Sequence, residues 1–285
     1  MISGMSTSVP SSITSSPVDI AFIGGGNMAT AIIGGLLRQG RAAVSILVID
    51  PVVEQRERLQ TQLGVQTAAG PDTALAQAHT VVWAVKPQQF KEAATACAAQ
   101  CPQALHYSVM AGLRTDDMAR LLGTPRIVRA MPNTPALVGQ GVTGVYARPE
   151  VTADEKAAIA KMIEPTGQHV WVEREADLDA VTALSGSGPA YVFYFIEAMV
   201  QAAEDMGLSA EQGRQLALAT FGGATALATQ SAESPATLRE RVTSKGGTTH
   251  AALTSMEAAG VKAAFVTAMR AAQRRAGELG DEFGR

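Results

Sequence analysis

A glycine-rich turn near the beginning of the sequence constrains the fold of this chain more than any other feature. An apolar run at residues 18–23 leads directly into Gly24-Gly25-Gly26-Asn27-Met28-Ala29, and a helical pattern follows at residues 28–39. Gly24 allows a tight turn, Gly26 lets the backbone approach a pyrophosphate, and Ala29 permits close packing of helix on strand. Amide N–H groups at a helix start favour phosphates. The turn therefore predicts a dinucleotide bound by Gly24, Gly26, Asn27 and Met28; the alternative is a turn with only a structural role.

Short β-branched runs alternate with helical patterns over the first two thirds of the chain, which is typical of a parallel α/β sheet. We expect strands at residues 18–23, 44–49, 65–67, 80–85, 105–109, 126–129, 142–147 and 169–172, and helices at residues 28–39, 53–63, 71–78 and 154–163. After about Asp177 only helical patterns remain, at residues 189–206, 209–230, 234–242, 250–259 and 261–279. The chain therefore divides into a disordered tail at residues 1–17, a dinucleotide-binding domain at residues 18–172 and a helical domain at residues 173–285.

The second predicted strand ends in Asp50, where the adenosine ribose of a dinucleotide is expected. A carboxylate there accepts hydrogen bonds from both ribose hydroxyls of NAD(H) and repels a 2′-phosphate. Arg56 and Arg58 follow within two helical turns and can pair with such a phosphate. The sequence therefore leaves NADH and NADPH both open.

The other predicted cofactor contacts lie in three loops that follow later strands. Ala84, Val85, Lys86 and Pro87 are expected along the nicotinamide ribose, Ala111 and Gly112 at the nicotinamide edge, and Asn133 as an amide partner for cofactor or substrate. For Lys86 the alternative is a solvated loop lysine, and for Asn133 it is a simple turn-forming role.

Two glycine-rich loops of the helical domain, at residues 184–191 and 243–250, each lead into a predicted helix. The second loop offers free backbone N–H groups, several hydroxyls and a helix N-terminus, which together suit a small carboxylate. Its predicted substrate-binding residues are Ser244, Gly246, Gly247, Thr248 and Thr249. The alternative is a helix cap with a flexible Gly-Gly hinge.

These motifs resemble those of a known family. The run LRERVTSKGGTTHAAL at residues 238–253 resembles the signature of pyrroline-5-carboxylate reductase, and FIGGGNMA, AVKPQ, MPNTPALVGQG and ALSGSGPAYVF occur in that family's order. The resemblance covers about residues 18–279. It implies an α/β Rossmann-type N-terminal domain plus an all-α C-terminal dimerisation domain, and an enzyme that reduces L-1-pyrroline-5-carboxylate to L-proline with NADPH or NADH, the last step of proline biosynthesis. It also implies a homodimer, a decamer of dimers as a larger assembly, and an active site between the two domains with helices of a partner subunit close by.

The reaction implied by this resemblance is hydride transfer from the nicotinamide C4 to C5 of a cyclic imine that carries a carboxylate. If the imine binds protonated, the site needs orientation more than a strong general acid. We expect the backbone N–H groups of residues 244–249 to hold the carboxylate and the Thr249 hydroxyl to contact the ring nitrogen. Thr249 and Ser244 are therefore the predicted catalytic residues, and His250 is expected to be structural.

Charge and cysteine content argue against several classes of function. The 23 Lys and Arg against 26 Asp and Glu give a net charge of −3, so the chain lacks the basic excess typical of binding to nucleic acid or an anionic membrane. No apolar run reaches membrane-spanning length, and residues 1–17 hold nine Ser or Thr and no Lys or Arg, which is unlike a signal peptide. Cys97 and Cys101 lie four apart without neighbouring histidines, which indicates neither a disulfide framework nor a metal site. We therefore expect a cytoplasmic protein that binds no metal.

Two other functions compete with this interpretation. A β-hydroxy acid dehydrogenase of similar build uses a lysine shortly after a glycine-containing motif in its second domain, whereas the residues that follow Gly188 here are Pro-Ala-Tyr-Val-Phe-Tyr. A non-enzymatic nucleotide sensor would bind NAD(P)H without oxidising it when the cyclic imine is added.

Overall fold

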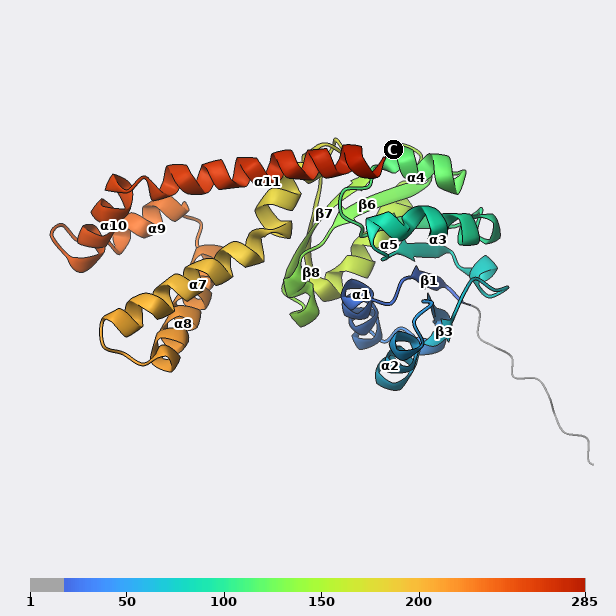
Figure 1. Ribbon diagram of the computed structural model, residues 1–285, viewed down its shortest axis with the longest axis horizontal. Helices are drawn as coiled ribbons and strands as arrows, with labels where there is room; N and C mark the ends of the chain where they lie inside the picture. Colours follow the sequence, from blue (N-terminus) through green and yellow to red (C-terminus); the bar gives the residue numbers. More distant parts are fainter. Residues whose placement is uncertain (1–17, 285) are drawn as a thin grey trace, which may run out of the picture.

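The computed structural model describes residues 18–284, so the tail predicted at residues 1–17 lies outside the described residues. Figure 1 shows a sheet domain at one end of an elongated molecule and a helical arm that extends away from it. Within the described residues, no helix combines the length and the apolar character that a membrane span requires.

In the described part of the chain, eight strands form one sheet with the order β3-β2-β1-β4-β5-β6-β7-β8. The strands are β1 (Ile20–Ile23), β2 (Ile46–Ile49), β3 (Gln66–Ala68), β4 (Thr80–Trp83), β5 (Leu105–Ser108), β6 (Ile127–Met131), β7 (Gly141–Ala147) and β8 (Gly167–Trp171). β7 runs antiparallel to β6, whereas every other neighbouring pair is parallel. The expectation of a wholly parallel sheet is therefore wrong at this pair, because the connection from Met131 to Gly141 is too short for a crossover helix.

Helices cover both faces of the sheet and divide its core in two. They are α1 (Asn27–Arg38), α2 (Val53–Leu63), α3 (Phe90–Cys97), α4 (Thr115–Leu122) and α5 (Ala153–Ile163). Alternate residues of β1 serve the two faces: Phe22 packs in one buried cluster with residues of α1 and α5, while Ile23 packs in the other with Phe90 of α3 and Met118 of α4. This burial on both faces explains the continuous apolar strands.

The helix predicted at residues 71–78 is wrong, because only a short 3₁₀ turn forms at Leu75–Gln77. The Asp72 side chain accepts a hydrogen bond from the Ala74 amide at 2.9 Å. Such a local bond competes with helix formation.

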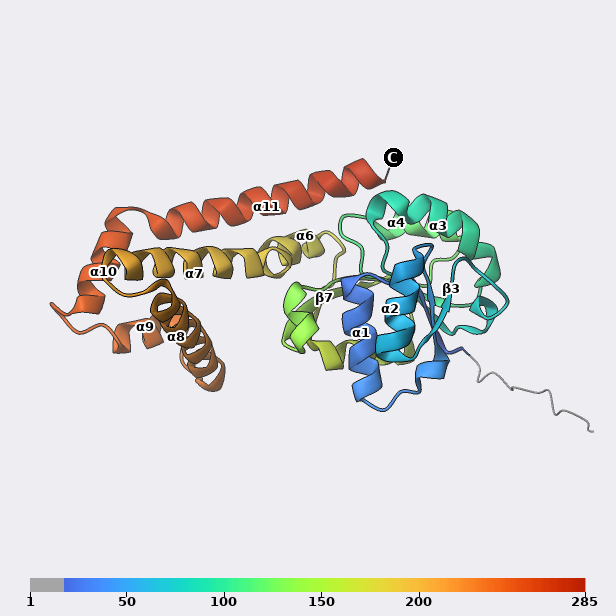
Figure 2. The ribbon, with the colours of Figure 1, turned by 60° about the horizontal axis from the view of Figure 1, so that its bottom comes forward.

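The arm consists of α6 (Asp177–Val181), α7 (Gly188–Asp205), α8 (Ala210–Gln230), α9 (Pro235–Arg241), α10 (Thr248–Ala258) and α11 (Val261–Phe283). The glycine-rich stretch after α6, predicted as a loop, is instead a π-helical turn over Thr182–Gly186 that leads into α7. Both ribbon views show α11 running back along the arm and ending beside α4 of the sheet domain (Figures 1 and 2). α11 extends beyond the predicted end at Leu279 because Phe283 packs against the core of that domain.

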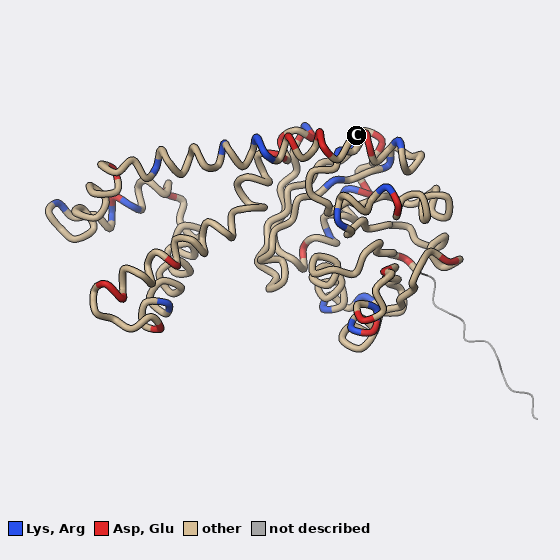
Figure 3. Tube along the Cα trace, in the orientation of Figure 1, with Lys and Arg blue, Asp and Glu red and all other residues tan. Residues whose placement is uncertain are grey.

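Much of the arm's apolar surface is exposed. The exposed large apolar side chains of α7 and α8 are Val192, Phe193, Tyr194, Met199, Leu216, Leu218 and Leu227. Figure 3 shows few charged residues along the middle of the arm, and α8 carries none from residue 215 to residue 230. This many exposed large apolar side chains on neighbouring helices is typical of an interaction surface.

Candidate active site

Gly24 and Gly26 occupy different environments within the predicted nucleotide turn. Gly24 has a φ of +94°, and a Cβ atom there would lie 2.7 Å from the Ala84 carbonyl oxygen. A Cβ atom on Gly26 would meet no heavy atom within 4 Å. Gly26 is the N-cap residue of α1, and no side chain caps this helix. The amides at the start of α1 therefore border open space, as a bound phosphate requires.

Asp50 is directed at the same turn. Its Oδ2 accepts a hydrogen bond from the Gly25 amide at 2.8 Å, and its Oδ1 accepts one from the Val52 amide at 2.9 Å. The Arg56 guanidinium donates to the Asp50 carbonyl oxygen at 2.7 Å. Arg58 makes only a long contact, of 3.4 Å, with the Thr30 hydroxyl. Asp50 thus links the end of β2 to the glycine turn, with the Arg56 guanidinium beside it.

The glycine turn borders a cavity of about 420 Å³. The predicted cofactor residues that line it are Gly24, Gly26, Asp50, Ala84, Val85 and Lys86. Asn27, Met28 and Pro87 belong to the adjoining helix starts but not to the lining. The cavity is also lined by residues that the sequence motifs did not indicate: Ala69, Gly70, Pro71 and the α3 residues Glu92, Ala93, Ala96 and Cys97. The small residues at 93, 96 and 97 share a helix face, which is the signal that could have revealed them.

The two cysteines are buried free thiols. Burial raises the pKa of Cys97 to about 11 and that of Cys101 to about 11, with a further contribution from Cys97 to the second. The Cys101 thiol donates to the Cys97 carbonyl oxygen at 3.3 Å. Both side chains are therefore protonated and unreactive at neutral pH. Among residues 18–284, no cluster of three or more His, Cys, Asp or Glu is arranged to hold a metal ion.

The predicted nicotinamide loop is held from outside its own domain. Gly112 has a φ of +77°, and a Cβ atom there would lie 2.9 Å from the Phe283 ring of α11. Neither Ala111 nor Gly112 lines the cavity. Asn133 is also outside it: its amide nitrogen donates to the Ser185 carbonyl oxygen at 3.2 Å, and its Oδ1 accepts from the Val142 amide at 2.9 Å. Asn133 thus joins the β6–β7 connection to the π-helical turn of the arm.

The predicted substrate loop forms a tight turn in front of α10. The Gly247 amide donates to the Ser244 carbonyl oxygen at 3.0 Å, and Gly246 has a φ of +75°. α10 begins at Thr248 with Gly247 as its N-cap residue and no side-chain cap. Ser244 is exposed and Thr249 is half-buried. The loop therefore presents uncapped amides and hydroxyls together, which is the arrangement that suits a small carboxylate.

Within one chain, the substrate loop and the nucleotide cavity are not brought together. Both ribbon views place α10 at the outer end of the arm, away from the sheet domain (Figures 1 and 2). The predicted residues thus form two groups, one at the carboxyl edge of the sheet and one at the far end of α11.

Comparisons with known proteins give matches for both parts of the chain. Residues 175–279 match the family model "Pyrroline-5-carboxylate reductase dimerisation", and residues 19–112 match "NADP oxidoreductase coenzyme F420-dependent". The pyrroline-5-carboxylate reductase of Pseudomonas aeruginosa is 43% identical over 93% of this chain and 98% of its own length, and that of Haemophilus influenzae is 40% identical over 91% and 97%.

Solved structures of similar proteins cover the whole fold. The pyrroline-5-carboxylate reductase of Coxiella burnetii has a TM-score of 0.86 and 36% identity, covering 93% of this chain and 99% of its own. The pyrroline carboxylate reductase of Plasmodium falciparum, solved with NADP bound, has a TM-score of 0.82 and 26% identity, with 92% and 98% covered.

Proposed function

The chain belongs to the pyrroline-5-carboxylate reductase family, and from that premise we propose which residues carry out its reaction. It is an NAD(P)H-dependent oxidoreductase that reduces the C=N bond of L-1-pyrroline-5-carboxylate to give L-proline, the last step of proline biosynthesis. The observation that carries the assignment of the nucleotide site is the open space beside Gly26, in front of the uncapped start of α1.

The nucleotide site fits a dinucleotide. The α1 amides border a cavity whose edge carries Asp50, placed by the Gly25 amide where a ribose is expected. When bound, the reduced nicotinamide supplies the hydride. The residues that we propose to bind the coenzyme are Gly24, Gly26, Asn27, Met28, Asp50, Ala84, Val85, Lys86, Pro87, Ala111, Gly112 and Asn133. Asp50 favours NADH and the neighbouring guanidinium groups favour NADPH, so the enzyme is expected to use both.

The substrate site is proposed to act by orientation. The amides of Gly246 and Thr248 bind the carboxylate of the imine at the start of α10, where the helix dipole favours an anion. Gly247 shapes this binding loop, because its own amide donates to the Ser244 carbonyl oxygen. Ser244 adds a hydroxyl to this loop, and Thr249 contacts the ring nitrogen through its own hydroxyl. These contacts place C5 of the ring for hydride transfer without a strong general acid.

We propose that each site is built from two subunits of a homodimer. This is supported by the distance between the two groups of residues in one chain (Figures 1 and 2), by the match of residues 175–279 to a dimerisation family model and by the exposed apolar side chains of the arm. A decamer of dimers is proposed as the larger assembly.

The division at residue 172 is kept as a functional boundary, because β8 ends at Trp171 and α6 begins at Asp177. The cytoplasm is proposed as the location, since the free thiols of Cys97 and Cys101 are typical of a reducing compartment.

An absorbance assay tests the reaction. Purified protein is mixed with NADH or NADPH, and L-1-pyrroline-5-carboxylate is added. Oxidation of either coenzyme above background, with formation of proline, is the expected result, and the ratio of kcat/KM values gives the coenzyme preference. Binding of both coenzymes without oxidation would instead identify a nucleotide sensor.

A substitution tests the role of Thr249. In Thr249→Ala, kcat/KM for the imine is expected to fall about ten- to a hundredfold, which is the usual effect of one lost hydrogen bond to a reacting group. The coenzyme Kd is expected to stay unchanged. Thr254→Ala is the matched control, because Thr254 lies on the same helix and its hydroxyl bonds only the His250 carbonyl oxygen. Equal kcat/KM values in both variants would remove Thr249 from the mechanism.

A further inference from the structure

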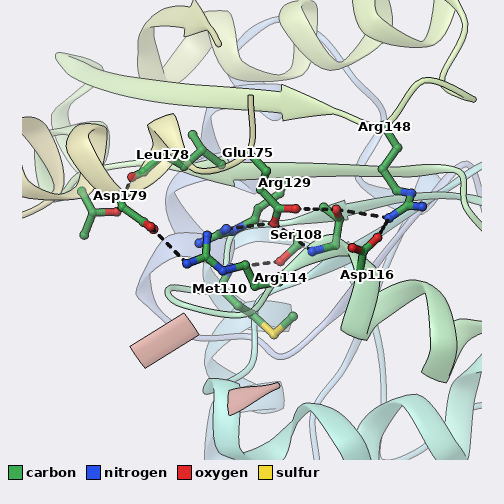
Figure 4. A network of polar contacts seen from close by, with 11 residues as sticks. Ser108, Met110, Arg114, Asp116, Arg129, Arg148, Glu175, Leu178 and Asp179 are labelled. Atoms are coloured by element: carbon green, nitrogen blue, oxygen red, sulfur yellow. Dashed lines mark hydrogen bonds and ion pairs between the residues drawn. The ribbon is translucent and has the colours of Figure 1, made fainter. Parts of the chain in front are cut away.

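Glu175 joins the arm to the sheet domain through both of its carboxylate oxygens. It lies on the connection between β8 and α6. Its Oε1 accepts hydrogen bonds from the Thr115 amide at 2.8 Å and from the Arg129 guanidinium at 2.9 Å, and its Oε2 accepts one from the Thr115 hydroxyl at 2.7 Å. Thr115 and Arg129 are only 1% and 3% exposed. Figure 4 shows Glu175 against Arg129 at this junction. These are buried, charge-assisted bonds, the stronger class of hydrogen bond.

Glu175 caps a helix of the other domain. Thr115 is the first residue of α4, and the N-cap residue Arg114 provides no side-chain hydrogen bond. The first amides of a helix have no partner within it, and a carboxylate near them also interacts favourably with the helix dipole. Glu175 therefore supplies from across the domain boundary the cap that α4 lacks. Glu175 is therefore one of the contacts that place the first turn of this eight-residue helix, together with the ion pair of Arg148 with Asp116.

The loop before α4 contains Ala111 and Gly112, the residues predicted at the nicotinamide edge, and the arm holds this loop at several points. Arg114, at the end of this loop, pairs with Asp179 of α6 at 3.1 Å (Figure 4). A Cβ atom on Gly280 of α11 would lie 2.7 Å from the Arg114 guanidinium, and Gly112 lies against Phe283. Glu175 contributes the most buried of these contacts. By contrast, Gly24 and Asp50, which are proposed to bind the pyrophosphate and adenosine part of the coenzyme, make none of these contacts with the arm.

We propose that Glu175 is a positioning residue for hydride transfer, which acts through the first turn of α4 to hold residues 109–112 against the nicotinamide end of the coenzyme. The proposal rests on the function proposed above. Glu175 touches neither substrate nor coenzyme. It fixes the loop that orients the nicotinamide, so its loss affects the chemical step rather than binding of the adenosine half.

Glu175→Gln tests this directly, because it preserves the size of the side chain and replaces the anion with an amide. With NADPH and L-1-pyrroline-5-carboxylate, kcat is expected to fall about tenfold or more, as a small misplacement of reacting groups does. The coenzyme Kd is expected to stay within about twofold, since the adenosine site is intact. NADPH deuterated at the transferred position is expected to show a larger isotope effect on kcat, because hydride transfer becomes the slow step. Glu173→Gln, two residues away and exposed, is the matched control and should behave as wild type.

Thr115→Val is the second variant, chosen in case Glu175→Gln does not fold. It removes the hydroxyl bond to Glu175 and a long contact of 3.4 Å from the Arg148 guanidinium, and it leaves the Arg129 pair and the Thr115 amide bond in place. The same loss of kcat and rise in isotope effect are therefore expected, but smaller than in Glu175→Gln. If either folded variant loses thermal stability but keeps wild-type kcat and isotope effect below its Tm, Glu175 is only structural and the proposal is wrong. The wild-type assay distinguishes a merely structural Glu175 from failure of the proposed function. If the proposed function is wrong, the unsubstituted enzyme itself does not oxidise NADPH with the imine.

Discussion

A side chain added at Gly24 and one added at Gly26 would meet different surroundings, although both residues belong to one turn. At Gly24 the positive φ and the 2.7 Å approach to the Ala84 carbonyl oxygen make any Cβ atom strained. Gly24→Ala is therefore expected to lower the free energy of unfolding by about 1–3 kcal/mol. At Gly26 the space is open, φ is −66° and ψ is −170°, which any residue adopts.

Gly26→Asp is accordingly expected to keep the stability of the protein, since Asp is a preferred N-cap residue. The added carboxylate occupies the place of the pyrophosphate and repels it, so coenzyme affinity should fall roughly a hundredfold or more. Urea unfolding and fluorescence titration with NADPH measure the two effects. Tight coenzyme binding by Gly26→Asp would show that the dinucleotide does not approach this turn.

His106 is a buried titratable residue that the proposed mechanism does not use. It is 1% exposed, and its Nδ1 accepts a hydrogen bond from the Trp83 indole at 3.0 Å, while its Nε2 has no partner. Burial, with a smaller contribution from the charge of Arg126, lowers the pKa of His106 to about 4. Unfolding restores the ordinary value of 6.5, so the unfolded chain binds more protons between pH 6.5 and 4.

The stability contributed by neutral His106 is therefore complete above pH 6.5 and is lost as the pH falls towards 4. The loss from this residue is about 3 kcal/mol at most. His106→Gln, whose amide oxygen can still accept from Trp83, should show a shallower fall in the free energy of unfolding over this range. Urea unfolding at several pH values measures the slopes, with the exposed His250→Gln as the control. Parallel curves for wild type and His106→Gln would contradict the expectation.

At the scale of elements, the sequence predicts what depends on local pattern. The β1–turn–α1 unit follows from an apolar run, two glycines with separate roles and a helical repeat, and all of these lie within neighbouring residues. The direction of β7 and the absence of a helix at residues 71–78 could not be predicted from local sequence pattern. The first depends on the length of a connection, and the second on the Asp72 side chain bonding the Ala74 amide.

The same limit applies to the elements of the candidate site. The glycine turn and the Thr249 loop can be predicted because each is one local stretch before a helix. The bonds of Asn133 to Ser185 and of Glu175 to Thr115 could not be predicted, because each pair is more than fifty residues apart in the sequence. Residue type alone suggests only that Asn133 is a turn former or a ligand. Its observed place, between the β6–β7 connection and the arm, depends on how the two domains pack.

At the scale of the whole molecule, the length of the arm determines how far the predicted substrate loop lies from the coenzyme cavity of the same chain. α11 begins just after α10, which carries the Thr249 loop, and ends on the Gly112 loop of the same chain (Figure 1). This helix separates the predicted substrate loop from the predicted coenzyme cavity of the same chain. In the homodimer proposed above, each arm would reach the sheet domain of its partner, and two equivalent sites would form.

Mixed dimers test this arrangement, because a two-subunit site allows two impaired variants to complement each other. Gly26→Asp lacks a coenzyme site and Thr249→Ala has a defective substrate loop. In a mixed dimer, one site combines both defects, while the other combines the intact cavity of the Thr249→Ala chain with the intact loop of the Gly26→Asp chain. Random pairing of equal amounts makes about half of the dimers mixed, so subunit exchange should restore about a quarter of wild-type activity. If each site were built within one chain, the mixture would show only the average of the two parent activities, because no pairing would then contain an intact site.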